Sequence, residues 1–206
     1  MRQESFGQNR KFSLVDKLGI FLSEKAVKKQ FKILKKDKIE LLDLGCGFYA
    51  RLLTRLASSI SSGTGVDLNI DESVKKIPNL VFIEKTIEEV LPDFKDRKYD
   101  CILIISVLEH INDPLSVLKE CFRILKDGGI LLINVPTWLG KYFLEKSAFN
   151  YKLSPKNEMD DHKMYYNKKD LWPLLVKAGF KPSLIKLKYH KFGLNLFSIC
   201  KNIRGD

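Results

Sequence analysis

The chain has 206 residues, of which 45% are hydrophobic and 30% are charged, and this length is enough for one domain with a sizeable core. No apolar run is long enough to span a membrane, and no apolar stretch follows the basic start, so no signal peptide is expected. The four cysteines (Cys46, Cys101, Cys121 and Cys200) are scattered without a C-x-x-C pair, which favours free thiols in a cytoplasmic protein and argues against a zinc site. The net charge of +11 resides in the flanks, because residues 1–40 hold 11 Lys and Arg against 5 Asp and Glu and residues 137–206 hold 14 against 6, whereas residues 41–136 hold 11 against 14.

Residues 1–38 are expected to form an N-terminal helical extension. Apolar side chains recur at helical spacing from Leu14 through Phe21 to Leu34, with lysines between them. A helix packed on the domain explains this pattern, and a basic amphipathic helix on a membrane surface is the alternative. The basic flanks are equally compatible with a solvated lysine-rich surface and with anionic partners such as phosphates, carboxylates or nucleic acid.

The middle of the chain alternates strand and helix patterns. The helix that begins with Asp113 as N-cap and Pro114 in its first turn is predicted to end at Gly128 and Gly129. The strand patterns are KIELLDLG, GTGVDL, LVFIE, YDCILIISVL and GGILLINVP. Strands that alternate with helices predict an α/β fold with a doubly wound, mostly parallel sheet and helices on both faces.

The C-terminal part of the chain departs from this alternation. NKKDLWPLLVKAGF is predicted to be a helix that ends at Gly179, and two strands then follow, separated by little more than a turn around Lys191. These strands are expected to form an antiparallel hairpin at the edge of the sheet. Residues 137–167 contain no clear element, which is typical of an insertion or lid over a binding site.

The stretch LLDLGCGFYA fits two cofactor-binding patterns. Gly45, Gly47 and Ala50 spell the G-x-G-x-x-A turn of dinucleotide-binding oxidoreductases, whereas Asp43, Gly45 and Gly47 spell the D-x-G-x-G turn of methyltransferases. Asp67 ends the next strand and could hold ribose hydroxyls in either case. Asp43 discriminates, because a carboxylate there repels a pyrophosphate and attracts the ammonium group of S-adenosyl-L-methionine (SAM), while the N–H groups of the turn face the carboxylate of SAM.

Several stretches in the same order resemble class I SAM-dependent methyltransferases of the small-molecule, methyltransferase-11-like type. The most specific of them is the fourth strand with its sequel LEHINDP and the later RILKDGG, and the resemblance covers most of residues 39–180. It implies a Rossmann-like seven-stranded sheet with an antiparallel last strand. It also implies SAM as the cofactor and S-adenosyl-L-homocysteine as its product.

The resemblance assigns the cofactor site residue by residue. The turn holds the methionine part of SAM, the acid that ends the second strand holds the ribose, and the loop after the third strand lies near the adenine. The residues concerned are Asp43, Gly45, Cys46, Gly47, Asp67, Leu68, Thr86, Ile87, Ser106 and Val107. Two positions depart from the family: Thr86 stands where an acid is common, and Tyr49 replaces a third glycine.

The acceptor side is less well defined. His110 and His162 are the candidate general bases, and no metal ligand is expected. The N-terminal helix and residues 137–167 are expected to cover the acceptor with aromatic side chains: Trp138, Tyr142, Phe143, Phe149, Tyr151, Tyr165 and Tyr166. The preferred acceptor is an oxygen or nitrogen atom of a small molecule, anionic or lipid-linked in view of the basic flanks. An RNA methyltransferase and a non-catalytic SAM-binding protein are the alternatives, and the sequence does not predict the oligomeric state.

Overall fold

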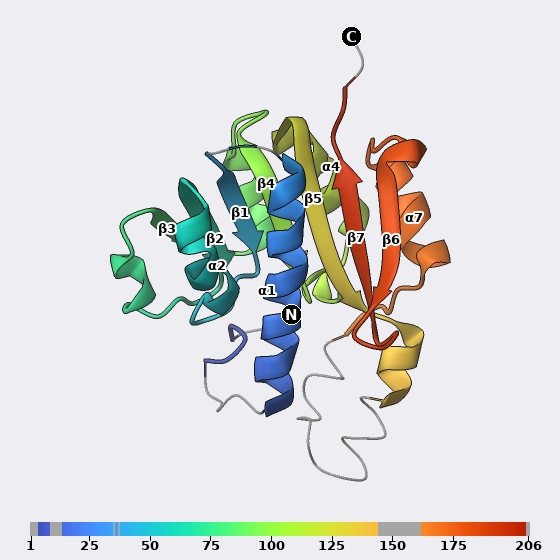
Figure 1. The fold of residues 1–206 in the computed structure, drawn as a ribbon, viewed down its shortest axis with the longest axis horizontal. Coiled ribbons are helices and arrows are strands. Elements are labelled where there is room, and N and C mark those ends of the chain that lie inside the picture. The colour runs from blue at the N-terminus through green and yellow to red at the C-terminus, as the bar shows by residue number, and fades with distance from the viewer. Residues whose placement is uncertain (1–3, 9–13, 35, 37, 144–161, 205–206) are drawn as a thin grey trace.

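The computed structural model describes residues 4–8, 14–34, 36, 38–143 and 162–204. These residues form one seven-stranded sheet in the order β3-β2-β1-β4-β5-β7-β6, with helices on both faces (Figure 1). The strands are β1 (Glu40–Leu44), β2 (Ser62–Asp67), β3 (Leu80–Glu84), β4 (Tyr99–Ile105), β5 (Leu125–Pro136), β6 (Ile185–His190) and β7 (Asn195–Lys201). The first five strands run parallel and β7 runs antiparallel to both β5 and β6, which confirms the predicted fold class and the edge hairpin.

The sheet separates two hydrophobic clusters, and alternate residues of the central strands contribute to them. Leu42 and Ile102 belong to one cluster, whereas Leu41 and Leu103 belong to the other. This alternation follows from the strand geometry, since successive side chains point to opposite faces. Both faces are covered, which is why β4 has the almost continuously apolar sequence of a central parallel strand.

Two groups of helices cover the two faces. One face carries α1 (Leu14–Leu34) and α2 (Arg51–Leu56), and α1 lies across the front of the sheet in Figure 1. The other face carries α3 (Ile87–Val90), α4 (Pro114–Ile124) and α7 (Lys168–Lys177). Val27 and Phe31 anchor α1 in the core, so the predicted packing of this helix on the domain is confirmed. No helix among the described residues is long and apolar enough to cross a membrane.

The predicted end of α4 was wrong. The helix stops at Ile124 and β5 begins at once with Leu125, so Gly128 and Gly129 lie within the strand. Asn202, beyond β7, explains the early exit. Its side-chain amide donates to the carbonyl oxygen of Leu125 at 3.0 Å, and its backbone bonds Gly128 and Gly129, which draws this segment into the sheet.

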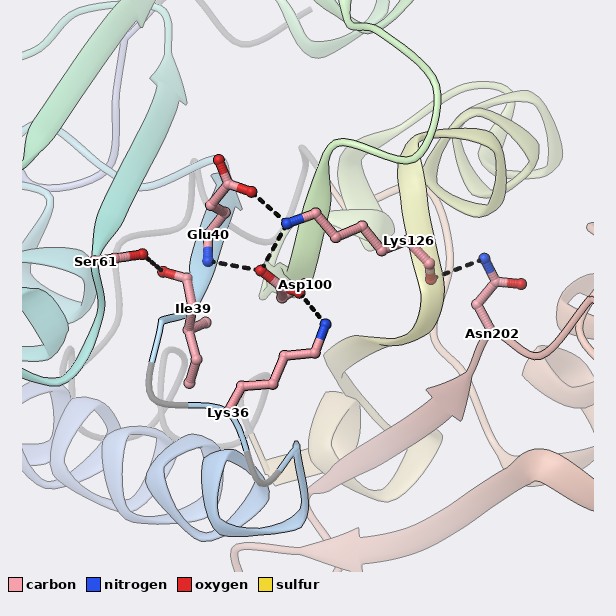
Figure 2. Close-up of polar contacts among 7 residues, drawn as sticks. All are labelled: Lys36, Ile39, Glu40, Ser61, Asp100, Lys126 and Asn202. Atoms are coloured by element: carbon pink, nitrogen blue, oxygen red, sulfur yellow. Dashed lines mark hydrogen bonds and ion pairs between the residues drawn. The ribbon is translucent and has the colours of Figure 1, made fainter.

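A buried carboxylate, Asp100, connects the N-terminal ends of the central strands, at the edge of the sheet opposite the glycine turn that follows β1. Asp100, at the start of β4, accepts hydrogen bonds from Lys36 Nζ at 2.5 Å, the Glu40 N–H at 3.0 Å and Lys126 Nζ at 3.0 Å (Figure 2). Burial alone would raise the pKa of Asp100, but these donors outweigh it and the pKa lies below its usual value. The network ties the segment after α1 to β1, β4 and β5, and so holds α1 against the sheet.

Candidate cofactor and acceptor site

The loop after β1 turns sharply on two glycines. Gly45 and Gly47 have φ of 74° and 80°, in the left-handed region. The N–H groups of Gly45 and Cys46 both donate to the carbonyl oxygen of Val66, at 2.8 and 3.1 Å, so the turn is tied to the end of β2. A Cβ atom at Gly45 would lie 2.3 Å from Val107 Cγ2, because the loop after β4 packs directly on the turn. Three strand ends therefore meet where the strand order switches, which is where open α/β sheets bind their ligands.

Tyr49 does not disturb this turn. The left-handed conformation falls on the next residue, Ala50, which has φ of 40° and is the N-cap of α2. The Tyr49 ring packs edge-on against Phe48, with ring centroids 4.9 Å apart, and the Arg51 guanidinium lies 5.7 Å from its centroid. The replacement of the third glycine is therefore tolerated, because the backbone of Tyr49 keeps a conformation that any residue adopts.

Two carboxylates flank the turn. Asp43, near the end of β1, is only 2% exposed, and burial together with the charge of Asp67 raises its pKa to about 7. Asp67, at the end of β2, accepts hydrogen bonds from the N–H of Gly47 at 2.7 Å and of Leu68 at 2.8 Å. A buried acid with a raised pKa becomes ionised more readily when a cation binds beside it, so this pair suits a cationic ligand.

The N-terminal segment lies over this pair, which the sequence did not predict. The buried Ser5 hydroxyl donates to Asp67 Oδ1 and accepts from the Asn69 N–H at 2.7 Å. The Phe6 carbonyl oxygen accepts from the Phe48 N–H at 3.0 Å. Ser5 therefore engages the carboxylate predicted to hold the ribose, and Phe6 engages the N–H of Phe48, the residue that follows the predicted turn.

The loop after β3 also differs in detail from the prediction. The Thr86 hydroxyl, a candidate contact for the adenine, is used in a capping box: it donates to Glu89 Oε2 at 2.8 Å and accepts from the Glu89 N–H at 3.3 Å. Thr86 thereby starts α3, whose first residue is Ile87. The carboxylate that bonds Thr86 belongs to Glu89 in the first turn of α3, three residues after the position where the family often has an acid.

The end of β4 is strained where it enters the site. Ser106 is exposed and has φ of 58°, and its N–H donates to the Asn134 carbonyl oxygen on β5 at 2.7 Å. Strain of this kind in a non-glycine residue is found mainly at functional sites. The next residue, Val107, packs on the Gly45 turn, so both predicted residues of this loop lie beside the cofactor turn.

The structure brings together the two candidate bases, which lie 52 positions apart. The ring centroids of His110 and His162 are 4.7 Å apart, and His162 Nδ1 lies 3.0 Å from the hydroxyl of Tyr165. Glu109, only 1% exposed, joins them, and its carbonyl oxygen accepts from the Lys163 N–H at 2.8 Å. This bond ties the loop after β4 to the segment before α7.

Lys191 is a further residue that the sequence did not single out. It lies in the β6–β7 turn, where Lys191, Phe192 and Gly193 all have positive φ, and a Cβ atom on Gly19 of α1 would be 3.6 Å from its Nζ. Burial lowers the pKa of Lys191 to about 8, and the charge of Glu109 partly opposes that shift. A lysine in a hairpin turn is usually solvated, so only the fold reveals that this one is half-buried.

The aromatic residues of the expected lid divide into three groups. Phe149 and Tyr151 lie outside the described residues. Tyr165 and Tyr166 are buried. The aromatic side chains of the helical residues 138–143 are exposed by 44 to 58%. The role of residues 137–167 as a lid stays a prediction.

Comparison with known proteins identifies the architecture. A family model described as a methyltransferase domain matches residues 15–184, which include the glycine turn, both acids and both histidines. The chain belongs to this methyltransferase family. The class I fold and SAM as cofactor, both implied by the sequence, agree with that membership.

This methyltransferase domain is similar to ubiquinone biosynthesis O-methyltransferases. It is 34% identical to the protein of Nitrosomonas europaea over 96 residues, 43% of this chain and 40% of that relative. It is 27% identical to the protein of Dinoroseobacter shibae over 153 residues, 70% of this chain and 60% of that relative. The chain therefore spans about half the length of these relatives.

Solved structures share the fold of this domain at low sequence identity. A methyltransferase in complex with the Trm112 methyltransferase activator of Haloferax volcanii has a TM-score of 0.68 and 13% identity, with 95% of this chain and all of that chain covered. A SAM-dependent methyltransferase from Archaeoglobus fulgidus has a TM-score of 0.63 and 16% identity, with 88% and 94% covered.

The residues present fit SAM. The glycine turn brings backbone close to the ligand position, Asp43 provides a buried negative charge for an ammonium group, and Asp67 lies at the end of the neighbouring strand as a ribose-binding acid does. The Ser5 hydroxyl bonds the same carboxylate, Asp67, that is predicted to hold the ribose.

Proposed function

We propose that this domain transfers a methyl group from SAM to an oxygen atom of a small molecule. The observation that carries the proposal is the junction between the two halves of the site. Val107 packs on the cofactor turn, and Glu109 and His110, two and three residues further on, meet His162. Groups that can contact an acceptor therefore stand immediately beside the residues that fit the cofactor. The similarity to ubiquinone biosynthesis O-methyltransferases supports oxygen over nitrogen as the acceptor atom.

The proposed reaction depends mainly on how the domain positions SAM and the acceptor relative to each other. SAM carries its methyl group on a positively charged sulfur. The acceptor atom must lie about 3 Å from the methyl carbon, on the side opposite the sulfur. Asp43 holds the ammonium group and Asp67 holds the ribose, while Ser106, with its positive φ, and Val107 set the path of the chain between cofactor and acceptor. The exposed aromatic side chains of residues 138–143 and the basic flanks suit an acceptor with an apolar part and negative charge.

Calorimetry tests the cofactor half of the proposal. SAM and S-adenosyl-L-homocysteine are expected to bind with one site per chain, and Asp67→Asn is expected to weaken SAM by at least about tenfold, since a charged hydrogen bond is lost. Asp93→Asn is the matched control, because Asp93 is an exposed acid on a surface turn. Binding of NAD in place of SAM would contradict the proposal.

Radiolabelled SAM tests the acceptor half. Label is expected in the small-molecule or lipid fraction of a lysate, in ether or ester linkage. Label in RNA would favour the nucleic-acid alternative, and its transfer should then weaken steeply with salt because phosphate contacts release counterions. Tight SAM binding without transfer to any fraction would favour a non-catalytic SAM-binding protein.

A further inference from the structure

We infer that Glu109, His110 and His162 form a binding site for a divalent transition-metal ion on the proposed acceptor side of the cofactor turn. One ligand atom of each residue, a carboxylate oxygen or a ring nitrogen, lies within 4.8 Å of the other two. The chain has three histidines, and two of them are brought together here from segments far apart in the sequence. The sequence predicted no metal site, because its ligands share no local spacing pattern.

The surroundings hold these side chains in place. The short helix Leu108–His110 follows directly from β4, and the Lys163 N–H to Glu109 carbonyl bond joins the two ligand-bearing segments at 2.8 Å. His162 Nδ1 lies 3.0 Å from the Tyr165 hydroxyl, so Nε2 would be the metal ligand of this histidine if that contact is kept. A partner on the second ring nitrogen is the usual means by which proteins orient a metal-binding histidine.

The spacing requires only a modest contraction. Zinc binds imidazole nitrogen and carboxylate oxygen at about 2.0–2.2 Å, which puts ligand atoms of a tetrahedral site about 3.4 Å apart. The three ligand atoms lie within 4.8 Å of one another, so they need to approach by about 1.4 Å at most. Rotation of the side chains about their torsions supplies movements of that size.

The donor set determines the type of ion. Two imidazoles and one carboxylate suit Zn²⁺ and its first-row neighbours, whereas Mg²⁺ and Ca²⁺ prefer oxygen ligands. Three protein ligands leave an open position, as in catalytic zinc sites. On the proposed function, an acceptor hydroxyl bound at that position would give up its proton to water more readily, because the metal lowers its pKa. The histidines would then act as ligands and not as general bases.

Lys191 provides an internal check on this inference. Its ammonium group lies close enough to Glu109 for their charges to interact, so its positive charge disfavours a second cation beside that carboxylate. Lys191→Met removes the positive charge and keeps an unbranched side chain that is one atom shorter. This variant is therefore expected to bind metal more tightly than the parent protein.

Direct metal binding tests the inference without any assay of activity. The full chain, freed of metal with a chelator, is titrated with Zn²⁺, Co²⁺ and Mg²⁺ by calorimetry, and its metal content is measured after gel filtration. One equivalent of Zn²⁺ or Co²⁺ is expected, with far weaker binding of Mg²⁺. The Co²⁺ spectrum should lack thiolate charge-transfer bands, which separates this site from the four buried cysteines.

Variants connect the binding to these residues. Loss of a residue that hydrogen-bonds a metal ligand typically lowers metal affinity about 10–100-fold, and Tyr165→Phe is expected to lower Zn²⁺ affinity by about tenfold. Glu109→Gln and His162→Ala each remove a ligand itself and are expected to lower it by more than about 100-fold. His190→Ala, which removes the histidine outside the cluster, should leave it unchanged. If His162→Ala fails to fold by circular dichroism, His162→Gln replaces it.

The outcomes distinguish this inference from the proposed function. Absence of stoichiometric Zn²⁺ binding, or binding that survives both Glu109→Gln and His162→Ala, would overturn the metal site while SAM binding and methyl transfer stand. Zinc binding with no methyl transfer to any acceptor would overturn the proposed function alone.

Discussion

Substitution of Gly45 by alanine is the sharpest test of the way the cofactor turn is built. The residue has φ of 74°, which costs a side-chain-bearing residue about 1–2 kcal/mol. The new Cβ would also lie 2.3 Å from Val107 Cγ2, and overpacking of this kind costs a further 1–3 kcal/mol, roughly. Together, Gly45→Ala should lower the free energy of unfolding by about 2–5 kcal/mol, a large part of the about 5–15 kcal/mol of a typical domain.

Gly128→Ala is the matched control for this substitution. Gly128 has φ of 76°, almost the same backbone conformation, but nothing lies within 4 Å of its added Cβ. It should therefore lose only the backbone part, about 1–2 kcal/mol. Adding Val107→Ala to Gly45→Ala should recover the steric part, which a double-mutant cycle isolates.

Urea unfolding followed by circular dichroism measures Gly45→Ala, Val107→Ala, their double variant and Gly128→Ala, and the slope of the free energy of unfolding against urea concentration should stay the same in all of them. Two results would contradict this prediction: Gly45→Ala and Gly128→Ala equally destabilised, or no recovery when Val107→Ala is added to Gly45→Ala. Either result would mean that the loop after β4 does not press on the cofactor turn.

Three further predictions concern single side chains. Ser5→Ala should tighten SAM binding severalfold in calorimetry, because the Ser5 hydroxyl bonds the Asp67 carboxylate that is predicted to hold the ribose. Ser23→Ala is the control, because Ser23 is a buried serine whose hydroxyl bonds within α1. An equal change in both variants would contradict a role for Ser5 at Asp67. SAM affinity should rise as the pH rises through about 7 and become pH-independent in Asp43→Asn, since burial raises the pKa of this carboxyl to about 7 and SAM needs the charged form; a flat profile in the parent protein would contradict this. The same raised pKa means that Asp43 favours folding below its unfolded pKa and that this contribution is lost as the pH rises through about 7. Asp100→Asn should cost about 3 kcal/mol or more in urea unfolding, because its two lysine partners lose a buried charge, whereas the exposed Asp96→Asn should cost less than about 1 kcal/mol. Since the pKa of Asp100 is lowered, its contribution is present above the unfolded pKa and lost as the pH falls through the folded one, so the two variants should converge with the parent in acid.

The sequence by itself determined the fold class and the cofactor, and it predicted the turn that binds the cofactor. Both depend on local patterns: apolar runs bounded by glycines predict buried parallel strands, and Asp43 two residues before Gly45 selects a cationic ligand. It misplaced the end of α4, since helical spacing continues past Ile124 and only Asn202, 77 residues beyond Leu125, draws the chain into β5.

Tertiary structure alone decided what stands around the cofactor turn. Ser5 reaches Asp67 across 62 residues, and His110 meets His162, which lies 52 positions further along the chain. Lys191 is half-buried because its hairpin turn folds against α1. These contacts join separate segments, so no spacing in the sequence encodes them. They form only when the parallel strands align their carboxyl ends at one edge of the sheet and bring the loops together there.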